Sequence, residues 1–433
     1  MTPVIAHLRN ILPELPLTRQ ADSLLWVYDK PLTAVSSAAY SKIVLLLPLL
    51  TMEFNILCNQ INHNLTYPAG VSTEEMTQRL NAALLLTQLL EYIHLHYLTV
   101  PREQVRFHQQ FEIFNSLFNE FNPPIVLLTS IPKKLLKSRV SLSHEIRTKT
   151  AAVNWYRLVF TRCKRVLNFL DLVVTGSPTL RTVVKVVDKY TNPAFAFLSW
   201  TYFVPRLGIN LFVLFKHMIP GFWMNAEEKQ LQWFIRTGAQ IQRRWFELAN
   251  DSVWFTVGLL NCFILTGVLA PLAIYVTISA FAYDVLISGI RAYVELKRLS
   301  NILAGYSNLL SGNDDRENTN DILDYERFIK HRIEFEKLRL SLHFTGTTAI
   351  FFAMCFALPS LAINPVFPLI GAVFLLMIWA VTFTLTIKLE QYRPKESVDK
   401  PINFNKNSFF AKAKPLNDQP LPPDEFDAGL AIP

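Results

Sequence analysis

Glycine and cysteine are both scarce in this chain, and no common catalytic motif is present. Only 13 of the 433 residues are glycine, which argues against the glycine-rich loops that cradle phosphate groups. The four cysteines are not paired at metal-ligand spacing and give no disulfide framework. The chain also has no P-loop, GxSxG, HExxH or CxxC pair. We therefore expect a protein that is not an enzyme and has neither a cofactor nor a bound metal.

Charged side chains are likewise few, at 18% of the residues, against about 25% in an average soluble protein. The 46 residues 342–387 contain no Asp, Glu, Lys or Arg, and about 20 apolar residues suffice for a helix to cross a bilayer. Pro359 and Pro365 interrupt its middle and disfavour a continuous helix. We interpret the interval as a transmembrane helical hairpin. The alternative, a buried hairpin of a soluble protein, would normally keep a polar face.

A second apolar interval, the 39 residues 252–290, contains a single charge, Asp284. A continuous helix of this length would measure about 58 Å and exceed the bilayer core of about 30 Å. Pro271 lies near its centre. We expect a second transmembrane hairpin here, and the alternative is one span followed by an amphipathic helix.

Basic residues flank both intervals but are absent from the two expected turns. They lie at Arg243, Arg244, Arg291, Lys297, Arg298, Lys337, Arg339, Lys388, Arg393 and Lys395. Lys and Arg near the ends of spans stay on the cytoplasmic side. This distribution predicts that all four flanks are cytoplasmic and that both turns face the opposite side.

The net charge of +8 arises from one part of the chain. Residues 101–191 carry 15 Lys and Arg against 6 Asp and Glu, an excess of 9. Basic helices beside a bilayer attract anionic headgroups, and the region has no nucleic-acid recognition motif. The candidate contacts to anionic lipid are Lys133, Lys134, Lys137, Arg139, Arg162, Lys164 and Arg165. A solvated loop is the alternative for the first four.

These patterns divide an all-α chain into six regions. Residues 1–191 are expected to form a helical, basic cytoplasmic or membrane-surface domain, and residues 192–251 an interfacial, aromatic-rich segment with a lead-in helix. The transmembrane hairpins at 252–290 and 342–387 enclose a helical cytoplasmic stalk at 291–341, which is short for a coiled coil. Residues 388–433 contain seven prolines and are expected to be a disordered tail.

Within the first two regions, turn and capping residues set the expected elements. Residues 1 to about 35 are expected to be a loose arm, followed by one helix over residues 35–62. A capping box begins at Ser72, and the helix at 102–121 carries phenylalanines on one face. Helices are also expected at 144–175 and 178–190. The aromatic segment after them is expected to break at Pro205, although a true span is the alternative.

Asp284 and Asn261 are the candidate polar residues inside the expected spans. An acid within a membrane is a functional candidate. Asp284 lies only two turns from Arg291, so we expect it near the interface, where its side chain reaches toward water. Glu91 and His94 form one ExxH pair, but a di-iron bundle needs two and no second is present. We therefore expect His94 to be a packing residue.

Three short stretches resemble the pattern of a known group of proteins. They are IPGFWM at 219–224, QRRWFELAND at 242–251 and VGLLNCF at 257–263. Over about residues 192–303 the chain resembles uncharacterised polytopic membrane proteins of intracellular bacteria that carry a type IV secretion system. The resemblance implies about four spans and no known activity, so it assigns no functional residues.

Together the patterns predict an integral, multi-pass membrane protein that works as a helical interaction or anchoring protein. The alternatives are a transporter or channel formed by the hairpins, a secreted bacterial effector that inserts in a host membrane, and an enzyme acting on lipid. The expected location is the bacterial inner membrane, or a host membrane if the protein is secreted. The expected partners are the lipid bilayer with its anionic headgroups and a protein partner or a second copy of the chain, and not nucleic acid.

Overall fold

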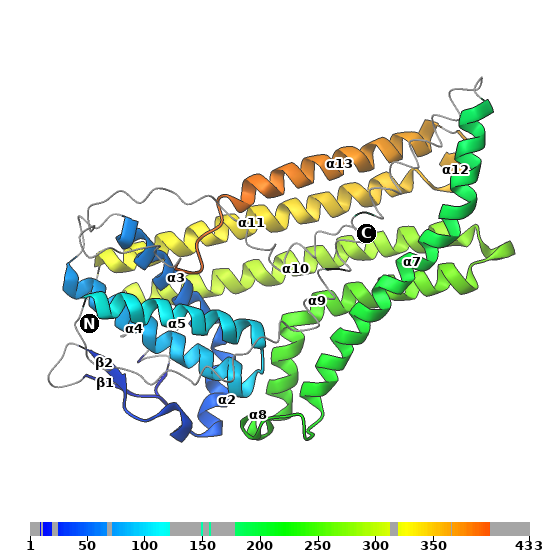
Figure 1. Cartoon of the computed structure of the whole chain (residues 1–433). Helices are drawn as coiled ribbons and strands as arrows, with labels where there is room; N and C mark the ends of the chain where they lie inside the picture. Colours follow the sequence, from blue (N-terminus) through cyan, green and yellow to red (C-terminus); the bar gives the residue numbers. More distant parts are fainter. Residues whose placement is uncertain are drawn as a thin grey trace.

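The computed structural model describes residues 9, 12–19, 25–66, 72–121, 149, 156, 178–311, 319–364 and 366–398. Within them the chain is mostly helical, as predicted, with a compact N-terminal bundle from which long helices extend to one side (Figure 1). The elements are β1 (Leu17–Arg19), β2 (Trp26–Tyr28), α2 (Ser37–Leu45), α3 (Leu47–Thr66), α4 (Thr73–Tyr92), α5 (Pro101–Phe121), α7 (Pro178–Met218), α8 (Ala226–Gln230), α9 (Trp233–Leu259), α10 (Leu272–Ser311), α11 (Thr319–Cys355), α12 (Pro359–Ala362) and α13 (Val366–Glu390).

Residues 12–19 and 25–35 are packed into the bundle, so the prediction of a loose arm is wrong for them. Strands β1 and β2 pair antiparallel, and Thr18 lies opposite Val27. Leucines on both sides of this ladder are buried in the bundle core: Leu12, Leu15, Leu17, Leu25 and Leu32. Their burial removes apolar surface from water, which outweighs the turn-forming prolines between them. The small β-ladder is an addition to the expected all-α architecture.

The single helix expected at residues 35–62 is two helices. Helices α2 and α3 meet at Leu46 and are bent by 66°. Pro48 lies in the first turn of α3, where a missing N–H costs no helical hydrogen bond. The bend lets α3 bury Phe54, Ile61 and most of its other apolar side chains in the bundle core.

Helices α4 and α5 confirm their predicted caps and faces. The Ser72 hydroxyl accepts a hydrogen bond from the Glu75 N–H at 3.1 Å, as a capping box requires. Phe107, Phe111, Phe114 and Phe118 of α5 are all buried in the core. A π-helical turn at Ile93–Tyr97 connects the two helices.

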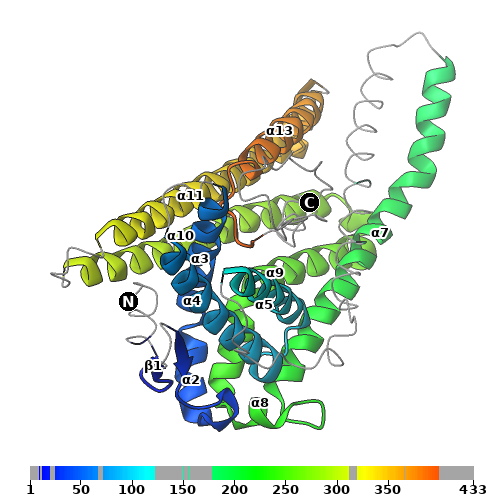
Figure 2. The same ribbon diagram turned by 60° about the vertical axis from the view of Figure 1, so that its left-hand side comes forward.

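Helices α10 and α11 lie side by side and antiparallel along most of their length (Figures 1 and 2). Their charged halves continue from the apolar halves without interruption, as the predicted stalk requires. Leu299 of α10, with Phe328 and Ile329 of α11, belongs to the same buried cluster as the N-terminal bundle. The stalk is therefore part of the bundle core.

Two of the described helices are long and apolar enough to cross a membrane by length and composition: α10, over Leu272–Gly305, and α13. The bent pair of α2 and α3 would add a third if it counted as one broken span. Because α3 is buried within the bundle, it fits the interior of that bundle better than a lipid environment. The two helices support the prediction of a membrane protein.

Helix α7 corrects the prediction of a break at Pro205. It is one helix of 41 residues that passes through both Pro193 and Pro205. Each proline removes one backbone hydrogen bond from the helix, so tertiary packing along α7 must offset the loss. The separate helix expected at 178–190 is the first part of α7. The lead-in helix is also divided, since the short α8 ends before α9 begins at Trp233.

Two turns separate the antiparallel helices of the apolar part. The π-helical turn Leu260–Ile264 and the 3-10 turn Gly267–Leu269 join α9 to α10, next to Pro271. Helix α12 joins α11 to α13. Gly371 permits a close approach in the second pair, because a Cβ there would lie 2.8 Å from the Ala353 carbonyl oxygen.

The segment after α13 returns to the bundle, so the prediction of a disordered tail is wrong for residues 391–398. Figure 1 shows this segment leaving the end of α13 toward α3 and α5. Val398 is buried in the bundle core. Residues 399–433 of the predicted tail lie outside the described residues.

His94 is a buried core residue, as expected. It lies in the π-helical turn, its Nδ1–H donates to the Leu90 carbonyl oxygen at 2.8 Å, and its ring centroid is 5.2 Å from that of Phe107. Burial lowers the pKa of His94 from 6.5 to about 4. The folded bundle therefore holds a neutral imidazole.

Acidification should destabilise the bundle through His94. Its folded-state pKa is depressed, so the stability it contributes is present above about pH 6.5 and is lost as the pH falls toward 4, by about 3 kcal/mol. In detergent, His94→Gln should flatten the dependence of the unfolding free energy on pH between 7 and 4. The control His63→Gln, at an exposed site on α3, should retain it. Parallel pH profiles for the wild type and His94→Gln would contradict this account.

Candidate functional site

The apolar part of the molecule contains a buried charged cluster formed by α7 and α9. The Asp251 carboxylate, on α9, is fully buried at 0% exposure. An Arg206 Nη2 lies 3.2 Å from one of its oxygens, and Asn210 Nδ2 donates to the other at 3.0 Å. Arg206 and Asn210 are four residues apart, so both face α9 from the same side of α7. A buried carboxylate needs such a charged and hydrogen-bonding partner set.

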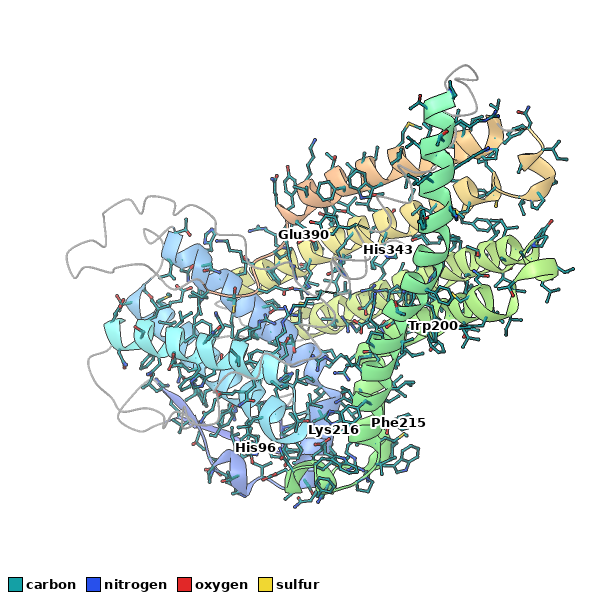
Figure 3. The ribbon with its side chains drawn as sticks, turned by 45° about the vertical axis from the view of Figure 1, so that its right-hand side comes forward. His96, Trp200, Phe215, Lys216, His343 and Glu390 are labelled. Carbon is teal, nitrogen blue, oxygen red and sulfur yellow. The ribbon has the colours of Figure 1, made fainter. Side chains whose placement is uncertain are left out.

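Close helix packing holds this cluster in place. A Cβ at Gly258 would lie 3.2 Å from the backbone of Trp200, so α7 and α9 approach at the point where Figure 3 labels Trp200. The Trp200 ring also packs edge-on against Phe263, with 5.2 Å between ring centroids. This contact and the Arg206–Asp251 pair lie on both sides of Pro205, and they explain why α7 continues through the proline.

A second buried acid, Asp284 of α10, contacts Trp254, which lies one turn after Asp251 on α9. Trp254 Nε1 donates to both carboxylate oxygens of Asp284, at 3.0 and 3.2 Å. The rings of Phe203 and Phe281 pack on the Trp254 indole, with centroids at 6.2 and 5.1 Å. Asp284 is only 9% exposed. The expectation that its side chain reaches toward water at an edge is therefore wrong, because α7 and α9 cover it.

Asn261 belongs to a different place in the structure. Its Nδ2 donates to the Thr277 hydroxyl at 3.2 Å, and that hydroxyl donates to the Ala273 carbonyl at 2.8 Å. These bonds join the turn after α9 to the start of α10. Thr277 and Asp284 are seven residues apart on α10, about 10 Å along the axis. The structure therefore does not bring Asn261 and Asp284 into one site.

Only one residue of this polar cluster, Asp284, was predicted from the sequence. The other members are Arg206, Asn210, Asp251 and Trp254. Neither Arg206 nor Asp251 was among the candidate site residues. The available signal was the spacing: Arg206 and Asn210 differ by four, and Asp251 and Trp254 by three, so each pair presents polar groups to one side of its helix. The predicted lipid contacts Lys133, Lys134, Lys137, Arg139, Arg162, Lys164 and Arg165 lie outside the described residues.

A further polar group lies in the bundle. Glu91 is 2.9 Å from His108 Nδ1, and His108 Nε2 is 3.7 Å from Glu112. Burial is the main cause that raises the pKa of Glu91. His94 bonds to its own helix instead of joining this group. Within the described part of the chain, no three His, Cys, Asp or Glu side chains are placed to hold a metal ion.

The part of the chain from the last turns of α7 to the first turn of α9 exposes aromatic side chains and is held by hydrogen bonds. Phe212, Phe222 and Trp233 are exposed, and Figure 3 shows Phe215 and Lys216 at this end of α7. His217 pairs with Glu228 at 2.6 Å, and Asn225 Nδ2 donates to the Leu95 carbonyl at 3.3 Å. Aromatic side chains held in this way are typical of a membrane interface.

No protein-family model, curated protein or solved structure matches this chain. The arrangement of its own residues therefore carries the functional argument.

The Arg206–Asp251 pair should be essential for stability. Asp251→Ala leaves a buried guanidinium without its carboxylate, so we expect the unfolding free energy to fall by about 3–5 kcal/mol. The double variant Arg206→Met/Asp251→Leu should recover most of the loss, because apolar replacements of similar volume avoid the desolvation cost. Ser252→Ala, at the exposed neighbouring position, is the control. Unfolding in detergent measures all four proteins, and a double variant no more stable than Asp251→Ala would refute the pairing.

Proposed function

We propose that this chain is a multi-pass integral membrane protein that holds a helical bundle against the bilayer as an interaction or anchoring module, without catalysis. One observation carries the proposal. Leu299, Phe328 and Ile329, on the stalk ends of α10 and α11, are part of the bundle core. A bundle fused in this way to apolar helices suits a protein that displays a binding surface at a fixed height above a membrane.

We further propose two transmembrane hairpins, in which the last part of α9 pairs with α10 and the last part of α11 pairs with α13. The basic flanks support a cytoplasmic stalk and bundle, with both turns on the opposite side. Val268 and Ile363, in these turns, are among the most exposed apolar residues described. The membrane is the bacterial inner membrane, or a host membrane if the chain is a secreted effector.

The bundle and the aromatic end of α7 to α9 would then contact the cytoplasmic headgroups. Lys216 and Lys229 accompany the exposed aromatic residues there, a composition that favours an anionic surface. The basic residues between 101 and 191 add to the same interaction. A protein partner or a second copy of the chain would bind on the bundle, and nucleic acid is not proposed as a partner.

Labelling of single introduced cysteines tests this topology. In a background in which the four native cysteines are alanine, Cys at Glu74 of the bundle and at Asn313 should react only from the cytoplasmic side, and Cys at Asn364 only from the other side. Glu74 is exposed on α4, and we expect the bundle and stalk on one side of the membrane because they share a core. Reaction of Asn313 and Asn364 from the same side would rule out the second hairpin.

A transporter is the second candidate, and the buried acids favour it. Asp251 and Asp284 lie in the apolar part of the chain, and buried ionisable groups are typical of ion and proton pathways. Each acid, however, has a fixed partner, Arg206 or Trp254. Such pairing is also what a structural role requires.

Proton flux into liposomes distinguishes the two functions. For an anchoring protein, we expect the wild type, Asp284→Asn and Asn261→Leu to give the same flux as empty liposomes, measured with an internal pH-sensitive dye. A wild-type flux that Asp284→Asn abolishes and Asn261→Leu preserves would establish the transporter instead. Insertion of each variant is verified by its resistance to carbonate extraction.

A further inference from the structure

A short segment after the last long helix is bound by side chains from distant parts of the chain. Residues 396–398 have no helical or strand pairing of their own. They contact α3 and α5 of the bundle and α11 of the stalk. Their partners in α3 and α5 lie 288–335 residues earlier in the sequence. We name the surface formed by Asn62, Arg106, Gln110 and Arg332 the tail-binding site.

Three side chains of the tail-binding site bond to the main chain of the segment. Gln110 acts in both directions: its Oε1 accepts from the Val398 N–H at 2.8 Å and its Nε2 donates to the Val398 carbonyl at 3.1 Å. Asn62 Nδ2 donates to the Ser397 carbonyl at 2.8 Å, and Arg106 to the Glu396 carbonyl at 3.0 Å. Hydrogen bonds to main chain supply affinity for a peptide of any sequence that can adopt this path.

Two side chains of the segment provide selectivity. The Glu396 carboxylate lies 2.6 Å from Arg332 and 3.6 Å from Arg393. Burial opposes its ionised form, but the guanidinium groups of Arg332, Arg393 and Arg106 prevail and lower the pKa of Glu396. Val398 is 1% exposed in the bundle core. The site therefore fits a carboxylate followed, two residues later, by a small aliphatic side chain.

Unlike a core helix, this segment can leave the bundle without unfolding an element of regular secondary structure. It begins six residues after the end of α13, has no regular secondary structure to unfold, and contributes one aliphatic side chain to the core. Release would cost four hydrogen-bonding contacts to the main chain and one ion-pair group, and the remaining core residues of the bundle come from other elements.

We propose that the tail-binding site is a peptide-recognition site, with residues 396–398 as its resident ligand in cis. The ligand class is an extended peptide with a carboxylate two residues before a small aliphatic side chain. Such a peptide from a protein partner binds the bundle when it displaces the resident segment. Because that segment is tethered at an effective concentration of about millimolar order, a free peptide competes only at similar concentrations or when the segment is loosened. This inference gives the proposed interaction function its binding site.

Fluorescence anisotropy with the full-length chain in detergent tests the site. The probe is a labelled peptide with the sequence of residues 391–400, QYRPKESVDK. The variant Val398→Asp places a charge where the core receives Val398 and so expels the resident segment. We expect the probe to bind Val398→Asp at least about 10-fold more tightly than the wild type, because the tether no longer competes. The same probe with Gln in place of its Glu should bind about 10-fold more weakly, since a charge-assisted contact is lost.

A neighbouring pair of glutamines supplies the matched control. Gln110→Leu, added to Val398→Asp, should abolish binding of the probe, whereas Gln109→Leu should not, because Gln109 is exposed on the outer side of α5. Should Val398→Asp fail to fold, Glu396→Gln loosens the segment more gently and should also bind the probe more tightly than the wild type. Folded variants that bind no probe, or that bind the Glu and Gln probes equally, would overturn the proposal. Since no bilayer is used, this result is separate from the topology test of the proposed function.

Discussion

The packing of α10 and α11 into the bundle core couples the two parts of the molecule. The two helices contain 40 and 37 residues, about 60 and 55 Å at 1.5 Å per residue. Their apolar ends are long enough to lie in a bilayer, and their other ends supply Leu299, Phe328 and Ile329 to the bundle. A rotation of the bundle relative to the apolar helices would therefore expose core side chains at a cost proportional to their buried area.

Buried and partly buried charges are tolerated in this structure where another chemical group pairs with them. Arg206 and Asp251 neutralise each other across α7 and α9, the Trp254 indole binds Asp284, and Arg332 binds Glu396. Each contact joins parts of the chain that are separate in the sequence, so it also defines which faces of these elements meet. Desolvation makes such pairs weak sources of net stability, but the loss of one partner is costly. They specify the arrangement of helices more than they strengthen it.

The features that depend on local chemistry could be predicted from the sequence. Composition and helical spacing predict the two apolar intervals, the turns near Pro271 and Asn364, the Ser72 cap and the phenylalanine face of α5. The features that depend on contacts between distant residues could not be predicted in this way. Proline alone predicts a break in α7, but Trp200 against Gly258 and Arg206 against Asp251 maintain the helix. The segment at residues 396–398 is mostly polar and close to prolines, and its position depends on Asn62, Arg106 and Gln110, which lie 288–335 residues earlier.

The contacts of Val398 also bear on how the protein is made. The bundle residues Asn62 and Gln110 leave the ribosome long before their partners, which follow 335 and 288 residues later. At about 5–20 residues per second, the nascent bundle waits roughly 15–60 seconds for the residue that completes its core. During that interval the apolar helices are synthesised next to it. A nascent chain therefore carries an unoccupied tail-binding site. A peptide or a chaperone that favours a carboxylate and an aliphatic side chain could bind there before residues 396–398 are synthesised and occupy the site.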